Sequence, residues 1–348
     1  MHPSPIDSAS AAPAGAAPAG AVPSSTAPAS ATVTPPRVDL LAVGQLFLDV
    51  LYGVLPAAPT PGQEIFTDHA QLSPGGIANF SAAASALGAR TAIAARIGDG
   101  PVSRITRTLL EDSGIDTTRL QTVPGWDLQV TSALPYAGDR ALVTGGPAPT
   151  DVASAPDVRG ASSIALHLGL EDLPWLAETD ATVWADVGWD ATGTWDRALL
   201  RHLAQCEGFL PNDVEAMAYT RTDSPLAAAR RLSELVPITV VTRGAEGAIG
   251  IDSRSGLEVE VGAPALGPVD PTGAGDTFGA ALIVLRERGL ELRDSLEAAC
   301  LAASARAAGL AGPGATPDLP HLAALAREHR LECTEALEAL LTEAAGQG

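Results

Sequence analysis

The chain has 348 residues, of which 46% are hydrophobic, and its 41 acidic and 21 basic residues give a formal net charge of −20. Every basic residue is an arginine, because the sequence contains no lysine. This acidic balance excludes binding to nucleic acid or to an anionic membrane through a broad basic surface. No apolar run approaches the roughly 18 residues that a transmembrane helix needs, so we expect no membrane partner.

Residues 1–36 differ in composition from the rest of the chain. They consist almost entirely of Ala, Pro, Ser, Thr and Gly, and they contain no Lys or Arg, so the positive start of a secretory signal is missing. We expect a disordered Ala/Pro-rich tail here, followed by one domain over residues 37–348. Cys206, Cys300 and Cys333 are an odd number without metal-binding spacing, which predicts reduced thiols in a cytoplasmic protein.

Short apolar segments recur along the domain. The first, residues 38–44, is Val-Asp-Leu-Leu-Ala-Val-Gly, a pattern typical of a buried strand in a parallel sheet. Further strands are predicted at 91–97, 163–168, 181–187, 208–210, 238–242 and 249–251, mostly separated by helical stretches. This alternation predicts right-handed βαβ units and an α/β fold with a mostly parallel sheet.

Two segments interrupt this alternation. Residues 51–72 are rich in Pro and Gly and predict small strands, and residues 128–144 alternate around Gly138-Asp139, which predicts a hairpin. Between them, Ser73-Pro74-Gly75-Gly76-Ile77-Ala78-Asn79 leads into a helix at 80–87.

Three polar residues stand at or just after predicted strand ends. Asp49 lies five residues past Gly44, and the local sequence fits a surface loop aspartate as well as a substrate ligand. We interpret His167 as a core or rim histidine, because the motif discussed below already offers a general base. Asp186 ends the strand at 181–187, near the expected site.

Two later turns carry polar groups. Asn212 and Glu215 have capping-box spacing, so Asn212 is expected to start a helix, although their oxygens would also suit a Mg²⁺ ion that keeps its waters. After the strand that ends at Thr242, a Gly-rich turn forms a hairpin with the strand at 249–251. Arg243 in this turn either reaches a phosphate or is an exposed arginine beside Glu246.

The strongest motif is Asp270-Pro271-Thr272-Gly273-Ala274-Gly275-Asp276, which runs directly into an apolar helix ending near Arg288. Glycines allow a tight turn and a close approach of the backbone, and the first N–H groups of a helix form an anion hole. Asp276 in the first turn is placed to take a proton from an attacking hydroxyl. The plainer interpretation is an aspartate that complements the helix dipole.

The string from Asp270 to Leu282 resembles the C-terminal signature of the ribokinase-like, or PfkB-type, carbohydrate kinases. Residues 73–79 resemble the N-terminal signature, although two residues rather than three separate Gly76 from Asn79. The resemblance covers about residues 37–318. It implies a ribokinase-like three-layer sandwich, with a small β lid from about residues 50–72 and 126–146.

The resemblance also implies roles for individual residues. As catalytic groups it indicates Asp276 as general base and the N–H groups of Gly273, Ala274 and Gly275 as anion hole. For the sugar it indicates Asp49, Gly75, Gly76 and Asn79. For ATP and Mg²⁺ it indicates Asn212, Glu215, Thr242, Gly244, Gly247 and Thr272, with Glu215 acting on the metal through water.

The substrate is the least determined part of this expectation. Ribokinases usually carry Asn at the position of Phe47, and the Lys often found after the glycines is absent here, so the sequence favours a neutral sugar other than ribose. A nucleoside kinase, with Phe47 facing the base, is the first alternative. A catalytically silent sugar-binding regulator is the second. By analogy with family lids, a homodimer through the lid is possible.

Overall fold

Strand β1 (Val38–Val43) is buried on both faces. Leu40 and Ala42 belong to one hydrophobic cluster, whereas Leu41 and Val43 belong to another. A strand of this kind lies inside a sheet that helices cover on both sides. The computed structural model describes residues 35–137, 139–147, 155–190, 192–267, 270–312 and 314–346, so the tail predicted at 1–36 lies outside them apart from Pro35 and Pro36.

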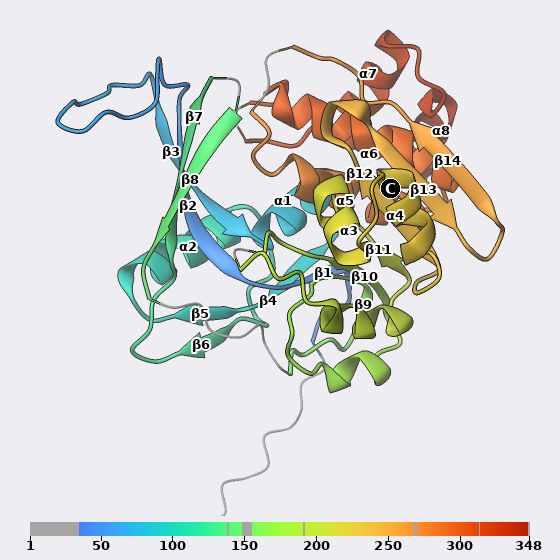
Figure 1. The fold of residues 1–348 in the computed structure, drawn as a ribbon, viewed down its shortest axis with the longest axis horizontal. Coiled ribbons are helices and arrows are strands. Elements are labelled where there is room, and N and C mark those ends of the chain that lie inside the picture. The colour runs from blue at the N-terminus through green and yellow to red at the C-terminus, as the bar shows by residue number, and fades with distance from the viewer. Residues whose placement is uncertain are drawn as a thin grey trace, which may run out of the picture. The chain divides into compact units, whose positions relative to one another are not determined.

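The main sheet has eight strands in the order β14-β13-β12-β11-β10-β9-β1-β4 (Figure 1). The strands from β12 to β4 pair in parallel, and β13 and β14 are antiparallel additions at one edge. The other strands are β4 (Thr91–Ala94), β9 (Ala161–His167), β10 (Thr182–Asp186), β11 (Gly208–Phe209), β12 (Ile238–Thr242), β13 (Ala248–Asp252) and β14 (Leu257–Val261).

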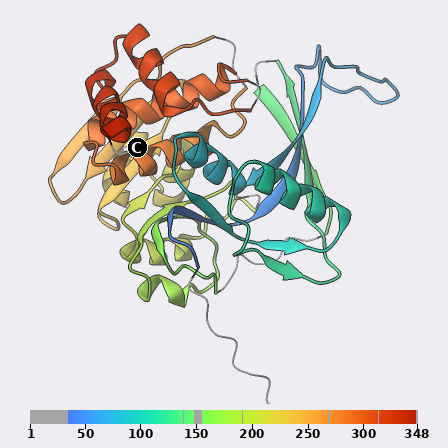
Figure 2. The same ribbon diagram turned by 180° about the vertical axis from the view of Figure 1, so that it is seen from behind.

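Helices form a layer on each face of this sheet. One hydrophobic cluster joins the sheet to α1 (Ala78–Ala86), α5 (Ala274–Glu287), α6 (Leu292–Ala307), α7 (Leu319–Glu328) and α8 (Thr334–Gly346). The other joins it to α3 (Asp213–Thr220), α4 (Pro225–Leu232) and the 3-10 segments η1 (Pro174–Ala177) and η2 (Arg197–Gln205). Helix α3 lies on the near side of the sheet in Figure 1, and helix α1 lies on the near side in the reverse view of Figure 2. These layers confirm the predicted α/β sandwich.

A second, four-stranded sheet contains β2 (Leu46–Tyr52), β3 (Ala70–Gly76), β7 (Val130–Tyr136) and β8 (Asp139–Gly145) in the order β3-β2-β7-β8. Strand β2 begins shortly after the end of β1, beyond Gly44. It pairs with β3 in antiparallel orientation and with β7 in parallel orientation. Strands β7 and β8 form an antiparallel hairpin. Figure 1 shows this sheet beside the main sheet and helix α2 (Pro101–Asp112) next to it.

Some local predictions were wrong. The segment 91–97 forms two strands, since β5 (Arg96–Gly98) leaves the main sheet to pair with β6 (Gln121–Val123). The strand β14 and the helices α7 and α8 had not been predicted. Within the described part of the chain, no helix is long and apolar enough to cross a membrane.

Helices α1 and α5 approach closely because α5 carries Gly279 at their contact. A Cβ atom at Gly279 would lie 2.6 Å from the ring of Phe80, which is only 1% exposed. The absence of a side chain at Gly279 therefore sets the distance between two helices that both lead to the site described below.

We expect Gly279→Val to lower the free energy of unfolding by about 1–3 kcal/mol, because the added side chain overpacks the contact with Phe80. Chemical denaturation measures this change. Gly145→Val is the control, since a Cβ at this glycine on β8 meets no atom within 4 Å. Equal losses in the two variants would contradict the close helix contact.

Candidate active site

Polar side chains gather where the parallel strands of the main sheet end. His167 is the last residue of β9 and Asp186 the last of β10, and the two are paired in register. Asn212 follows β11, and helix α5 begins nearby with Asp276 in its first turn. The carboxyl edge of an open α/β sheet is the usual place for ligand binding.

Asp276 contacts residues from two other elements. Its Oδ2 accepts a hydrogen bond from Asn79 Nδ2 at 3.1 Å, and its Oδ1 lies 3.9 Å from His167 Nε2. Burial raises the pKa of the Asp276 carboxyl, while His167, Asn79 and Arg306 favour its ionised form. Burial lowers the pKa of His167, so its ring favours the neutral state. Asp276 is therefore more basic than an ordinary aspartate, and His167 is less basic than an ordinary histidine.

Arg306, which sequence reasoning had not singled out, supports the Gly-rich turn. Its Nε donates to the Thr272 carbonyl at 3.2 Å, its Nη1 donates to the Gly314 carbonyl, and the residue is 6% exposed. Gly273 has a φ of 70°, and a Cβ there would lie 2.5 Å from Arg306 Nη2. Only glycine fits both the left-handed backbone and the guanidinium beside it.

The start of α5 differs in detail from the predicted anion hole. The Ala274 N–H donates to the Pro271 carbonyl at 3.1 Å, so it is already used within the turn. The N–H groups of Gly273, Gly275 and Asp276 donate to no other described residue. Thr272 Oγ1 is buried and has no hydrogen-bond partner in the described part of the chain. Donors for an anion are present, although Ala274 is not among the free ones.

Asp49 belongs to the four-stranded sheet and is close enough to Asp276 for the two charges to interact. It lies on β2 opposite Ser73 of β3 and Thr131 of β7. A Cβ at Gly75 would lie 2.2 Å from Asp49 Oδ2, so the glycine makes room for the carboxyl group. Burial, and next the charge of Asp276, raise the pKa of Asp49 to about 6.

Asn212 and Glu215 form the predicted capping box. Asn212 Oδ1 accepts from the Glu215 N–H at 2.9 Å, and Glu215 Oε2 accepts from the Asn212 N–H at 3.0 Å. Burial raises the pKa of Glu215 to about 7. Burial, followed by the charges of Glu215 and Asp276, raises the pKa of Asp186 well above its usual range. This accumulation of carboxyl groups favours a nearby cation.

His167, Asp186 and Asp276 also have the arrangement of a metal-binding group. One potential ligand atom from each lies within 4.8 Å of the other two. Oxygen ligands suit Mg²⁺ better than an imidazole does, so Asp186 is the better candidate for contact with that ion. His167, interpreted from the sequence as a core or rim residue, instead faces Asp276.

A cavity of about 320 Å³ lies against the start of α5. Thr242, Gly244 and Gly247 from the β12–β13 turn line it together with Ala274 and Gly275. Small residues of α6 form another wall: Cys300, Ala303, Ser304 and Ala307. Of the six residues expected near the nucleotide and its metal, Thr242, Gly244 and Gly247 thus line one cavity, whereas Asn212, Glu215 and Thr272 are not among its lining residues.

Arg243, in the same turn, does not pair with the Glu246 carboxylate. Its Nη2 lies 3.2 Å from Glu260 Oε2 and donates to the Glu246 carbonyl at 3.3 Å. The arginine therefore joins the turn to β14.

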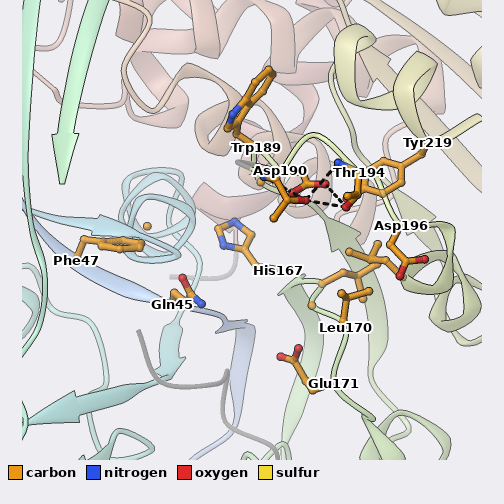
Figure 3. A pocket seen from close by; sticks show the side chains of 16 residues that line it. Gln45, Phe47, His167, Leu170, Glu171, Trp189, Asp190, Thr194, Asp196 and Tyr219 are labelled. Carbon is orange, nitrogen blue, oxygen red and sulfur yellow. Dashed lines mark hydrogen bonds between the residues drawn. The ribbon is translucent and has the colours of Figure 1, made fainter. Parts of the chain in front are cut away.

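A larger cavity of about 700 Å³ is lined by His167 and by residues that follow β9 and β10 (Figure 3). Its lining includes Gln45, which precedes β2, Phe47 of β2 and Gly76 of β3. Gly76 has a φ of 64°, and a Cβ there would lie 2.3 Å from the Gln45 carbonyl oxygen. Of the four predicted substrate residues, Gly76 lines this cavity, whereas Asp49, Gly75 and Asn79 do not. The Asn79 amide donates to Asp276 instead.

Over residues 56–312 the chain matches the family described as pfkB family carbohydrate kinase. This match spans most of the 348 residues, so the chain belongs to the pfkB family of carbohydrate kinases. A search of curated proteins gives no match.

Solved structures show the same fold. A putative ribokinase II from E. coli in complex with ATP and Mg²⁺ is 18% identical, with a TM-score of 0.71 over 84% of this chain and 99% of that one. Ribokinase from Arabidopsis thaliana, complexed with ribose and ATP, is 22% identical, with a TM-score of 0.67 over 83% of this chain and 98% of that one. Adenosine kinase from Sinorhizobium meliloti is 20% identical, with a TM-score of 0.67 over 84% and 99%.

Replacing Asp276 by Asn should stabilise the protein. A raised pKa means that folding disfavours the charged form of the carboxyl group relative to the unfolded chain. A neutral side chain at this position therefore removes the free-energy cost of burying that charge at pH 7. We expect the free energy of unfolding to rise by about 0.5–2 kcal/mol, the usual range for stabilising substitutions. Thermal and chemical unfolding at pH 7 measure it.

Asp190→Asn is the matched control with the opposite sign. Hydrogen bonds from Thr192 and from the Trp195 N–H lower the pKa of Asp190 to about 2, so its charged form stabilises the fold above the unfolded value of 3.8. This variant should lose stability at pH 7. A destabilised Asp276→Asn would contradict the inferred cost of the buried charge.

Proposed function

We propose that this protein transfers the γ-phosphoryl group of ATP to a hydroxyl of a small, neutral carbohydrate. The position of Asp276 carries this proposal. The residue before it, Gly275, lines the 320 Å³ cavity, and the residue it faces, His167, lines the 700 Å³ cavity. A general base between a nucleotide cavity and an acceptor cavity is well placed for the transfer of a phosphoryl group from the nucleotide to the acceptor.

In the proposed reaction, Asp276 takes the proton of the acceptor hydroxyl as the oxygen forms a bond to phosphorus and the bond to ADP breaks. Asn79 and His167 hold the carboxylate in position. Asp49 and the backbone at Gly75 and Gly76 orient the sugar. Enzymes of this class act mainly by positioning and by stabilising charge.

The described residues fit a nucleotide. Thr272 Oγ1 is a buried polar atom without a partner, Gly275 has a free N–H, and the cavity next to them is lined by small residues. Thr242, Gly244 and Gly247 would contact the nucleotide from the β12–β13 turn. ATP supplies the phosphoryl group, and Mg²⁺ neutralises charge on its phosphates.

For the metal, we propose Glu215 as a group that acts through water, with Asn212 beside it. Their mutual capping bonds use one oxygen of each, which leaves the second Glu215 oxygen for a metal-bound water. Asp186 adds a carboxyl group close to Asp276.

A nucleoside acceptor is the second candidate. Phe47 lines the larger cavity, where an aromatic ring could face a base, and an adenosine kinase is among the structural neighbours. A silent sugar-binding regulator is less well supported, because binding alone requires neither the Asp276 carboxylate nor free N–H groups at the start of α5.

The test is ADP release with Mg-ATP and a panel of pentoses, hexoses, sugar phosphates and nucleosides. We expect turnover with a neutral acceptor and a loss of kcat of about 10²–10⁴-fold in Asp276→Asn, with ATP binding retained, as for removal of a general base. Leu257→Ala, on the far strand β14, is the control. Full turnover in Asp276→Asn would refute the role of Asp276.

The activity should also fall on the acidic side of neutrality. Asp49 and Asp276 are proposed to act as carboxylates, and both pKa values are raised, that of Asp49 to about 6. We therefore expect kcat/KM to decrease as the pH falls through about 6, rather than through the ordinary aspartate value of 3.8. A pH profile of kcat/KM that stays flat down to pH 4.5 would exclude this assignment.

A further inference from the structure

The 700 Å³ cavity, in which we propose that the acceptor binds, extends well beyond His167 and the neighbouring Asp276. From His167 it continues along the residues that follow β9 and β10, as far as Trp189 and Tyr219 (Figure 3). Its volume of about 700 Å³ lies within the roughly 300–1,000 Å³ of pockets that enclose drug-sized ligands. Asp276 does not line this cavity, but His167, which faces Asp276, does, so in the proposed reaction the sugar ring would lie at the end near Gly76 and His167. The end near Trp189 stays open.

Trp189 forms part of this far end and is supported by other aromatic rings. Trp189 is 71% exposed, and its indole meets Trp195 edge to face, with ring centroids 5.3 Å apart and planes at 87°. Trp195 contacts Tyr219 in the same way, at 5.3 Å and 89°. Trp195 and Tyr219 are 9% and 4% exposed, so Trp189 rests on buried rings and keeps its own surface uncovered.

The loop that carries Trp189 is held by Asp190. The Asp190 carboxylate accepts hydrogen bonds from the Trp195 N–H at 2.6 Å, from the Thr192 N–H at 2.9 Å and from Thr192 Oγ1 at 2.7 Å. These bonds keep the pKa of Asp190 near 2, so they persist at neutral pH. An aromatic surface fixed in this way binds a ligand without a large ordering cost.

The charges around the cavity restrict what can bind. Glu171, Asp190 and Asp196 contribute carboxylates to the lining, and no Arg or Lys occurs among the described residues that line it. A phosphorylated acceptor would meet only like charge here, whereas an uncharged or cationic group would not be repelled. Leu170 and Leu199 add apolar surface, which favours the flat face of a ring.

We propose that the acceptor carries a second ring, uncharged or cationic, that stacks on Trp189 while the first ring presents its hydroxyl to Asp276. This inference rests on the proposed kinase function and specifies the substrate of the same site. The second ring is either the heterocyclic base of a nucleoside or the sugar or aryl group of a glycoside. Both offer a flat face to an indole.

The experiment compares acceptors that share one sugar. Each free sugar is assayed for Mg-ATP-dependent ADP release beside its methyl glycoside, its aryl glycoside, a disaccharide, the corresponding nucleoside and its phosphate ester. We expect kcat/KM for a two-ring acceptor to exceed that of the free sugar and the methyl glycoside by at least about tenfold. The better of the nucleoside and glycoside arms identifies the second ring.

Trp189→Ala then tests the proposed contact. We expect it to raise KM for the two-ring acceptor by about tenfold or more, as for loss of a stacking partner, with kcat retained. The KM of the free sugar should not change. Trp189→Phe should restore much of the affinity, and Leu257→Ala, on the distant β14, should have no effect.

Three outcomes would contradict the proposed second ring without affecting the proposed kinase function. These are equal kcat/KM for one-ring and two-ring acceptors, a preference for the phosphate ester, or equal effects of Trp189→Ala on both acceptor types. In each case ADP release that depends on Asp276 would still support the kinase. If no acceptor stimulates ADP release in wild-type protein, the proposed function fails, and this inference fails with it.

Discussion

The structure of the site depends on a guanidinium group buried among carboxyl groups. Arg306 holds the Gly-rich turn through the Thr272 and Gly314 carbonyls, and its charge acts on Asp49, Asp270 and Asp276. The chain has an excess of 20 negative charges and no lysine, so cationic side chains are scarce. Without this arginine, the Gly-rich turn would face several carboxylates with little to offset their charge.

Much of the architecture could be predicted because its signals are local. The buried strands, the Gly-rich turn before α5 and the Asn212–Glu215 capping box each lie within a few consecutive residues. A strand buried on both faces and a helix that starts after glycines follow from short-range sterics and burial. These features predicted the α/β class and the position of Asp276, the proposed general base, in the first turn of α5.

The missing parts of the site depend on contacts between distant segments. His167 and Asp276 are far apart in the chain and meet only because β9 ends beside the start of α5. Arg306 is one of several arginines in helices, and nothing in its neighbourhood indicates that it reaches Thr272. The Asn79 side chain faces Asp276 because Gly279 lets α1 approach α5, a packing relation that no single segment contains.

Strand β2 continues directly from β1 and carries Asp49 into the lid sheet. Any inward movement of that sheet therefore brings one carboxylate toward another, that of Asp276. At neutral pH the electrostatic repulsion between these two carboxylates increases as the distance between them decreases, unless hydroxyl groups lie between them. The two carboxylates therefore repel one another, and in the proposed reaction an acceptor with two correctly spaced hydroxyls offsets that repulsion by donating to both.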